Sequence, residues 1–279
     1  MDNKTLQENV TENVRRALLE DVGPGDISAE LIDPQANASA RVITRSPGIF
    51  CGKPWVEETI KQVDANVRLD WHVEDGDAIS ANMPLFDLSG AARSLLTAER
   101  TMLNFVQLLS GTATRTAEYV ALIRDTDTTL LDTRKTLPGL RIAQKYAVSC
   151  GGGQNHRIGL FDAFLLKENH ISAAGSITNA VARARALHPN RDVEVEVESI
   201  HELKEAIAAG ADIAMIDNFT LEETKEAVDL AKGEIKLEAS GGINANSITD
   251  IASTGVDYIS IGDLTKTVTP LDLSMRFKD

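Results

Sequence analysis

The chain has 279 residues, of which 43% are hydrophobic and 25% charged, a composition that excludes a largely disordered protein. At roughly 150 residues per domain, this length predicts about two domains. The 28 basic and 42 acidic residues give a formal net charge of −14, so we expect no general binding to nucleic acid or to an anionic membrane. An anionic ligand must therefore be bound by a local basic cluster.

The two cysteines, Cys51 and Cys150, are too few for a disulfide framework or a four-cysteine zinc site, which predicts reduced thiols. The chain begins with a polar segment, and no run approaches the roughly 18 apolar residues that a membrane helix needs. We therefore expect a cytoplasmic protein without a signal peptide.

The first part of the chain combines helices and short strands. Residues 8–21 place apolar side chains at helical spacing. Short strands are predicted at residues 40–44, 67–73 and 85–88. Residues 95–109 have a wide apolar helical face, and we expect this helix to end at Ser110-Gly111, before a second helix over residues 113–124. This α+β pattern predicts a wall or dimerisation domain.

From residue 128 onward, short apolar strands alternate with helical segments. The expected strands are residues 129–131, 163–166, 193–197, 213–216, 236–239 and 258–261. The expected helices are residues 177–187, 200–209, 221–231 and 247–254. Such alternation predicts βαβ units with a parallel sheet, and a barrel is favoured because no Gly-x-Gly-x-x-Gly motif follows the first strand.

Polar or small residues lie at the end of every expected strand, which is where a parallel barrel has its active site. They are Asp132 to Lys135, Lys167 to His170, Glu194 to Glu198, Asp217-Asn218, Ser240 to Gly242, and Gly262-Asp263. One such group is commonly only a solvated strand end, but six in phase predict a shared site.

The charges around this site point to an anionic ligand. From Arg134 to His170 the sequence holds six Lys or Arg residues and two acidic residues, a local charge of +4, and His156 and His170 add protonatable groups. Mutual repulsion among clustered cations is relieved by a polyanion, and an arginine fork suits carboxylate or phosphate.

Glycine-rich segments supply candidate phosphate-binding loops. Gly151-Gly152-Gly153 precedes His156-Arg157, and three consecutive glycines let the backbone approach a ligand closely, although a plain linker has the same composition. Ser240-Gly241-Gly242 and Ser260-Ile261-Gly262 follow the last two strands, where barrels commonly bind phosphate; structural turns are the alternative.

Carboxylates face the same region. Alternation puts Glu194, Glu196 and Glu198 on one face of their strand, with Glu198 interpreted as the most solvated. Glu196 and Asp217 lie on successive strands, and such a pair suits a Mg²⁺-bound phosphate with a ribose between the carboxylates.

In order along the chain, these motifs resemble the quinolinate phosphoribosyltransferase family, also called nicotinate-nucleotide diphosphorylase (carboxylating). The matching segments are Glu99 to Asn104, Asp132 to Arg141, Gly151 to Arg157, Leu166 to His170, Val193 to Glu198, Ile216 to Asn218, and Ser240 to Gly242. The resemblance extends from about Leu18 to Phe277.

The resemblance implies that quinolinate and 5-phosphoribosyl 1-pyrophosphate give nicotinate mononucleotide, pyrophosphate and CO₂ with Mg²⁺, in NAD biosynthesis. It also implies an N-terminal open-faced α/β sandwich over residues 1–110 and a seven-stranded α/β barrel of the TIM type over residues 111–267. The tail at 268–279 is expected to return to the first domain. A homodimer is implied, with Arg100 completing the neighbouring subunit's site.

Site roles follow from the same resemblance. The groups expected to bind the quinolinate carboxylates and the pyrophosphate are Thr133, Arg134, Lys135, His156, Arg157 and Lys167. Lys135 and Lys167, with Glu196 and Asp217 at the ribose and the metal, are the expected catalytic residues. The 5′-phosphate is expected at Ser240, Gly241, Gly242, Ser260, Ile261 and Gly262. Some family members have a small residue in place of Asp263 and His in place of Lys266, which leaves detail there open.

Two other functions are compatible with the residues. A barrel aldolase would use Lys135 or Lys167 as a Schiff-base nucleophile, its pKa lowered by a neighbouring cation. A non-catalytic pyridine-dicarboxylate sensor would bind without turnover, although the intact set of charged residues favours an enzyme. The proposed chemistry needs no pyridoxal or thiamine group, because a pyridinium is itself an electron sink.

Overall fold

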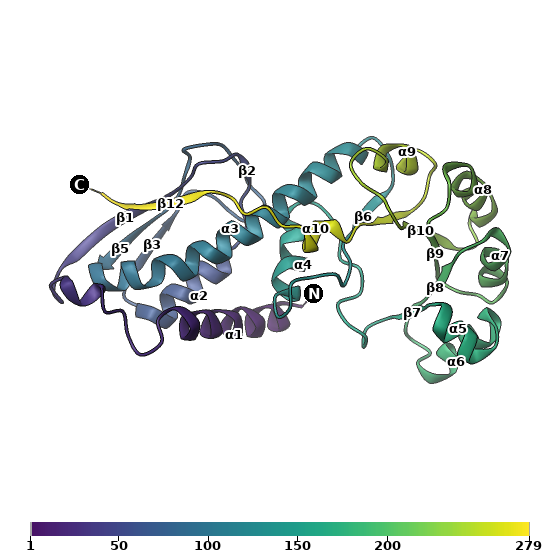
Figure 1. Cartoon of the computed structure of the whole chain (residues 1–279), viewed down its shortest axis with the longest axis horizontal. Coiled ribbons are helices and arrows are strands. Elements are labelled where there is room, and N and C mark those ends of the chain that lie inside the picture. Colours follow the sequence, from purple (N-terminus) through teal and green to yellow (C-terminus); the bar gives the residue numbers. More distant parts are fainter. Residues whose placement is uncertain (1, 279) are drawn as a thin grey trace. The chain divides into compact units, whose positions relative to one another are not determined.

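The structure, a computed structural model, describes residues 2–278 and divides into two compact units (Figure 1). The first unit comprises the described residues up to Ala117, then Thr136–Gly152, then those from Leu264 onward. The second unit comprises Glu118–Lys135 and Gly153–Asp263. These units differ from the predicted division into residues 1–110 and 111–267, because residues 136–152 group with the first unit.

The first unit contains a four-stranded antiparallel sheet in the order β12-β1-β5-β3. Its strands are β1 (Asn37–Thr44), β3 (Arg68–Trp71), β5 (Pro84–Ala91) and β12 (Leu273–Phe277), and a separate pair joins β2 (Gly48–Ile49) to β4 (Ala78–Ile79). The expected return of the C-terminal tail is seen in β12, which pairs with β1 (Figure 1). Leu85, Phe86 and Leu88 of β5 are fully or almost fully buried in the core of this unit.

Helices complete the first unit. They are α1 (Asn3–Asp21), the short η1 (Ala29–Leu31), α2 (Lys53–Asp64), most of α3 (Ala92–Ile123) and α4 (Arg141–Cys150). Helix α4 contributes Ala143 and Ala147 to a core with Trp55 and Phe105. This apolar face explains why residues 136–152 belong to the first unit. The sequence analysis did not predict this helix or its contact with the first unit.

The predicted break at Ser110-Gly111 is wrong, because α3 runs without interruption from Ala92 to Ile123. Ser110 Oγ accepts a hydrogen bond from the Cys51 backbone N–H at 2.9 Å. A Cβ on Gly111 would lie 2.3 Å from the Thr269 carbonyl oxygen. The two small residues therefore allow backbone segments to pack closely on the helix.

The second unit is built on a six-stranded parallel sheet in the order β6-β11-β10-β9-β8-β7. The strands are β6 (Thr129–Leu131), β7 (Phe164–Leu166), β8 (Val193–Val197), β9 (Ile213–Asp217), β10 (Lys236–Ser240) and β11 (Tyr258–Ser260). All six predicted strands are confirmed, to within one residue at their ends. At the β6 edge of this sheet, Gln154 forms an isolated parallel bridge with Leu131. Among the described residues, this is the one bridge outside the named strands.

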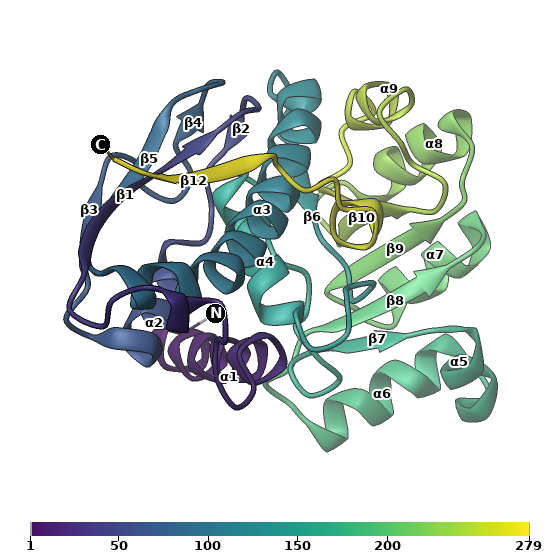
Figure 2. The same ribbon diagram turned by 60° about the vertical axis from the view of Figure 1, so that its left-hand side comes forward.

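Helices cover one face of this sheet, as both ribbon views show (Figure 2). They include α5 (Glu168–Ala174), α6 (Ile177–Leu187), α7 (Ile200–Ala208), α8 (Leu221–Ala231) and α9 (Ile248–Ala252), and α10 (Asp263–Lys266) follows β11. The helices expected between the strands are confirmed, with α9 shorter than predicted, whereas α5 was not predicted. Because all strands are parallel, their carboxyl ends meet at one edge, where the predicted site residues lie.

Candidate functional site

The segment after β6 packs against the segment after β11. Thr133 Oγ1 accepts a hydrogen bond from the Lys135 backbone N–H at 3.0 Å. A Cβ on Gly262 would lie 2.8 Å from Lys135 Cδ and 3.4 Å from Thr133 Oγ1, so a side chain here would displace the Lys135 side chain. The structure thus brings a predicted cationic residue beside a predicted phosphate loop.

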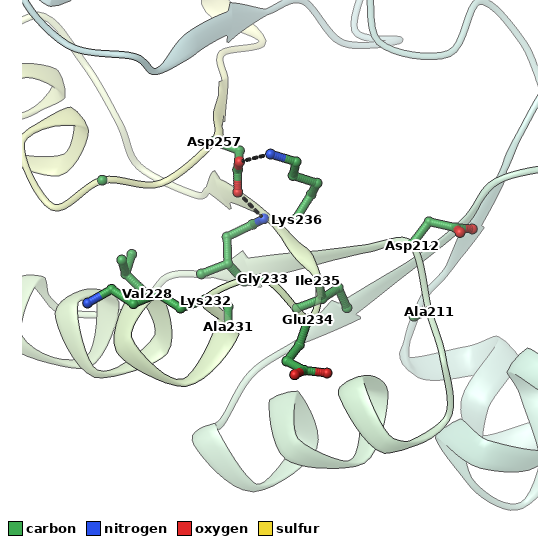
Figure 3. A pocket seen from close by; sticks show the side chains of 12 residues that line it. Ala211, Asp212, Val228, Ala231, Lys232, Gly233, Glu234, Ile235, Lys236 and Asp257 are labelled. Carbon is green, nitrogen blue, oxygen red and sulfur yellow. Dashed lines mark hydrogen bonds and ion pairs between the residues drawn. The ribbon is translucent and has the colours of Figure 1, made fainter.

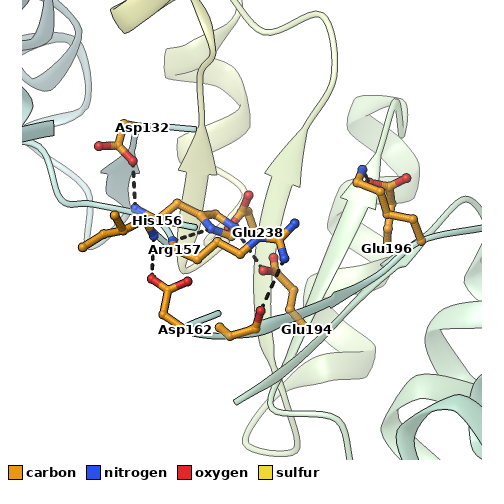
Figure 4. Close-up of polar contacts among 10 residues, drawn as sticks. Asp132, His156, Arg157, Asp162, Glu194, Glu196 and Glu238 are labelled. Carbon is orange, nitrogen blue, oxygen red and sulfur yellow. Dashed lines mark hydrogen bonds and ion pairs between the residues drawn. The ribbon is translucent and has the colours of Figure 1, made fainter. Parts of the chain in front are cut away.

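The His156-Arg157 segment is held by buried Asp132, the residue that follows β6 (Figure 4). The Asp132 carboxylate accepts hydrogen bonds from Asn155 Nδ2 at 2.7 Å and from the His156 backbone N–H at 2.9 Å. Gln154 exchanges backbone hydrogen bonds with Leu130 and Asp132. These contacts fix the backbone after the glycine run, so it is not a free linker.

The His156 ring faces two glutamates from different strands. Its Nε2 lies 3.0 Å from Glu194 Oε2 of β8 and 3.4 Å from Glu238 Oε2 of β10. Burial of the ring opposes its protonation, but hydrogen bonds and charge from both carboxylates raise the pKa of His156 to about 10. Burial raises the pKa of Glu194 to about 7, partly offset by the hydrogen bond from His156.

The other ring nitrogen of His156 lies against the next residue. Nδ1 is 2.7 Å from the Arg157 backbone nitrogen, so the position of the ring is coupled to the start of Arg157.

Arg157 is partly buried beside a second guanidinium. Its Nη1 donates to the Ala163 carbonyl oxygen at 3.3 Å. Burial and the nearby charge of Arg134 lower the pKa of Arg157, whereas Glu194 and Asp162 act in the opposite direction. Two neighbouring guanidinium groups in a partly buried site form a favourable environment for a carboxylate or phosphate.

At the end of β7, Lys167 forms an ion pair with Glu196 of β8. The Lys167 side chain is 46% exposed and that of Glu196 is 14% exposed, so the ammonium remains open to a ligand. His170 Nδ1 accepts a hydrogen bond from the Lys167 backbone N–H at 3.0 Å. This contact caps α5 and gives exposed His170 a structural role.

The ends of β9 and β10 also lie against each other. Asp217 accepts a hydrogen bond from Asn218 Nδ2 at 2.8 Å, and the Asn218 backbone N–H donates to the Ser240 carbonyl oxygen at 3.1 Å. Gly241 has φ +92°, and a Cβ there would lie 2.3 Å from Asn218 Oδ1. Gly242 continues the turn with φ +63°. This tight turn requires glycine at Gly241.

Three of the cationic residues singled out in the sequence lie in the first unit. Arg100 is exposed on α3, and Arg141 and fully buried Lys145 lie on α4. Ser260 and Ile261 are buried, so Ile261 offers its backbone rather than its side chain. Glu198 is exposed, as expected. The local charge counted along the sequence is therefore divided between the two units.

Sequence reasoning gave no role to two buried acids among the strand-end groups, Asp132 and Glu194, and did not single out a third, Glu238. Asp132 stood within a recognised motif, and Glu194 shared the face of Glu196. Glu238 had its own signal, since it is an acidic residue between Leu237 and Ala239 in an apolar strand. A lone acid in a buried strand requires a polar partner, and here the partner is His156.

A pocket of about 500 Å³ lies at the opposite edge of the sheet, where the strands begin (Figure 3). Lys236 and Asp257 line it and form an ion pair at 2.5 Å. Asp257 also accepts a hydrogen bond from the Leu237 backbone N–H at 2.9 Å. In parallel α/β folds, residues at the ends where the strands begin stabilise the fold, whereas catalytic residues lie at the carboxyl ends of the strands.

Convergent cations and carboxylates at the carboxyl ends of parallel strands define an enzyme of the α/β class that binds an anionic substrate. Residues 26–110 match the N-terminal domain of quinolinate phosphoribosyl transferase, and residues 112–276 match its C-terminal domain. The chain belongs to the quinolinate phosphoribosyltransferase family.

Similarity to known proteins extends over nearly the whole chain. A probable nicotinate-nucleotide pyrophosphorylase (carboxylating) of Bacillus subtilis is 44% identical over 258 residues, which cover 92% of this chain and 89% of that protein. The enzyme of that name from Mycobacterium leprae is 41% identical, with 95% of each chain covered. The solved structure of the nicotinate-nucleotide pyrophosphorylase from Francisella tularensis has 52% identity and a TM-score of 0.95, covering 98% of this chain and 97% of that one. Among residues 2–278, no helix is long and apolar enough to cross a membrane.

Proposed function

We propose that this chain is a pentosyltransferase that converts quinolinate and 5-phosphoribosyl 1-pyrophosphate to nicotinate mononucleotide, pyrophosphate and CO₂ in NAD biosynthesis. The observation that carries the proposal is the gathering of mutually repelling cations at the carboxyl ends of the sheet, where Asp132 fixes the backbone of the His156-Arg157 segment and Arg134 lies near enough to lower the pKa of Arg157. A planar dicarboxylate relieves this repulsion and accepts bidentate hydrogen bonds. The names of the Francisella and Bacillus relatives support the same reaction.

The carboxylates suit the ribosyl half of the reaction. Loss of pyrophosphate leaves positive charge on the ribose, which Glu196 and Asp217 would stabilise from neighbouring strands. Lys135 and Lys167 would stabilise the charge that develops on the leaving group. The Lys167–Glu196 ion pair places a cation and an anion side by side. This arrangement suits a reaction in which positive charge develops on the ribose and negative charge on the pyrophosphate.

The pyridine half needs orientation more than acid–base chemistry. Arg134, Arg157 and His156 would hold the quinolinate carboxylates so that the ring nitrogen faces the anomeric carbon. The new C–N bond forms as the C–O bond to pyrophosphate breaks. The resulting pyridinium accepts the electron pair left by the departing CO₂, and a proton then replaces the carboxylate.

Magnesium would be held by Glu196 and Asp217 together with substrate oxygens. Among the described residues, neither Glu196 nor Asp217 belongs to a group of three or more potential metal ligands. These two side chains can therefore supply only part of an octahedral coordination shell. That fits an ion that enters with pyrophosphate and keeps substrate and water ligands. When bound, Mg²⁺ would neutralise charge on the leaving group.

The finer architecture is part of the proposal. The isolated bridge at Gln154 supports a seven-stranded barrel, in which this segment supplies the seventh position. The four-stranded sheet with its helices supports an open-faced α/β sandwich in the first unit. Residues 111–267 would form the catalytic domain of a cytoplasmic homodimer, with exposed Arg100 donated to the neighbouring site and Ser240 to Gly242 and Ser260 to Gly262 binding the 5′-phosphate.

The test is an assay of purified protein with Mg²⁺, quinolinate and 5-phosphoribosyl 1-pyrophosphate. We expect nicotinate mononucleotide and CO₂ in equal amounts, and neither when one substrate is omitted or nicotinate replaces quinolinate. Quinolinate binding without product would indicate a sensor. Borohydride-dependent covalent trapping of a carbonyl substrate at Lys135 or Lys167 would indicate an aldolase.

A further inference from the structure

Two buried glutamates have no part in the mechanism above. Glu238 is 1% exposed and Glu194 is 4% exposed. Among the described residues, neither Oε1 of Glu238 nor Oε1 of Glu194 has a hydrogen-bond partner, and Glu238 Oε2 has an ion-pair contact with His156 Nε2 at 3.4 Å. A carboxylate buried in this way destabilises the fold unless a cation or proton compensates it. We therefore looked for a function of these two buried carboxylates on β8 and β10.

Both carboxylates converge on one atom, Nε2 of His156, from β8 and β10 (Figure 4). Glu196, Met215 and Glu238 are in register on the three adjacent strands. Parallel strands in register present such residues on one face, and Glu194 lies on that face as well. The rigid sheet therefore fixes the position of the imidazole from two sides.

The orientation of His156 is passed on to Arg157. The His156 backbone N–H donates to Asp132, while its Nδ1 contacts the Arg157 backbone N–H. A rotated ring would lose both contacts with the carboxylates and would move the start of Arg157. The Glu238 contact thus orders the two side chains assigned to the substrate carboxylates.

We propose that Glu238, assisted by Glu194, is a positioning residue that acts through His156 to orient the quinolinate-binding His156-Arg157 pair. This inference rests on the proposed function. Neither glutamate contacts the substrate in this scheme. Glu238 holds the ring at Nε2, so that the His156 ring and the Arg157 guanidinium keep fixed positions toward the dicarboxylate.

Steady-state kinetics of Glu238→Gln and Glu238→Leu test the proposal. The leucine variant removes a contact that holds the His156 ring and so weakens a charged hydrogen bond to the substrate, and we expect it to raise the KM for quinolinate at least about tenfold. The KM for 5-phosphoribosyl 1-pyrophosphate should stay within about twofold, since its ligands lie elsewhere on the strand ends. Glu238→Gln keeps an acceptor for Nε2–H and should lie between wild type and Glu238→Leu.

A matched control is Glu58→Gln, which alters an equally buried glutamate in the first unit that is 4% exposed. It should leave both KM values unchanged. The pathway through His156 is tested by a double variant: Glu238→Leu should add little to His156→Asn, because residues that act as a unit are not additive. Equal rises in both KM values, or full additivity, would overturn the proposal.

Quinolinate binding by calorimetry gives a second readout that does not depend on turnover. If wild type makes product but Glu238→Gln and Glu238→Leu bind quinolinate like wild type, the inference fails alone. If wild type neither binds quinolinate nor makes product, the proposed function fails as well. A stoichiometric divalent ion in purified wild type that is lost in Glu238→Gln would show a metal site instead and would overturn the positioning role. If Glu238→Leu does not fold, the KM values of Glu238→Gln for the two substrates are compared in the same way.

Discussion

At the scale of single residues, the site depends on buried acids that hold its cations. Asp132 fixes the His156 backbone, Glu194 and Glu238 fix its ring, and Glu196 pairs with Lys167. The cationic residues were predictable because they follow strands within recognisable motifs. The acids were harder to predict, since their partners lie on other strands and only the folded sheet brings them together.

The cluster around His156 also predicts how stability changes with pH. The pKa of His156 is raised from 6.5 to about 10 in the folded protein, so the folded state retains a proton that the unfolded state loses. The stabilisation is complete below the unfolded pKa and is lost as pH rises through the folded one. We therefore expect the free energy of unfolding to fall between about pH 6.5 and 10.

Urea unfolding at a series of pH values measures this slope. His156→Asn removes the titrating ring and should flatten the profile over that range, whereas His188→Asn, a change outside the cluster, should preserve it. An unchanged slope in His156→Asn would assign the pH dependence to other groups.

At the scale of elements, the period of the hydrophobic pattern identified the strands of the second unit well. A short apolar run such as residues 213–216 can be a buried strand or part of a buried helix, and the flanking helices favour the strand. The first unit was less predictable, since α4 packs on residues more than 80 positions earlier, such as Trp55. Ser110-Gly111 was misread because glycine serves both as a helix end and as a site of close backbone approach.

Helix α3 therefore yields a prediction about Gly111. In Gly111→Ala the new Cβ would meet the Thr269 carbonyl oxygen, so the tail that leads to β12 must shift. Overpacking of this kind typically costs about 1–3 kcal/mol, more than alanine gains in helix propensity. Thermal unfolding should show a lower Tm for Gly111→Ala and little change for Ala121→Ser at an exposed position of the same helix. An unchanged or higher Tm in Gly111→Ala would mean that the tail adjusts without cost.

At the scale of the whole molecule, a chain with net charge −14 groups several of its cations at a few strand ends, where an anionic substrate would bind. Overall charge favours solubility, while the local field selects the ligand. The parallel sheet of the second unit followed from the sequence, whereas the homodimer stays a prediction that the family resemblance implies. Arg100 is exposed in the first unit, and the family resemblance assigns it to the neighbouring subunit's site, so its role is tested with two copies of the chain.

Subunit complementation tests that role. If Arg100 completes the neighbouring site, a homodimer of Arg100→Ala lacks this cation in both sites and should lose most activity. The same holds for Arg134→Ala, which removes a cation of the receiving site. A heterodimer of the two variants combines one site that carries both defects with one that carries neither, so mixing with subunit exchange should restore activity toward half that of wild type per dimer. Differently tagged subunits allow the heterodimer to be purified and verified. Absence of recovery in that heterodimer would place Arg100 within its own subunit's site, because each of the two sites would then carry one defect.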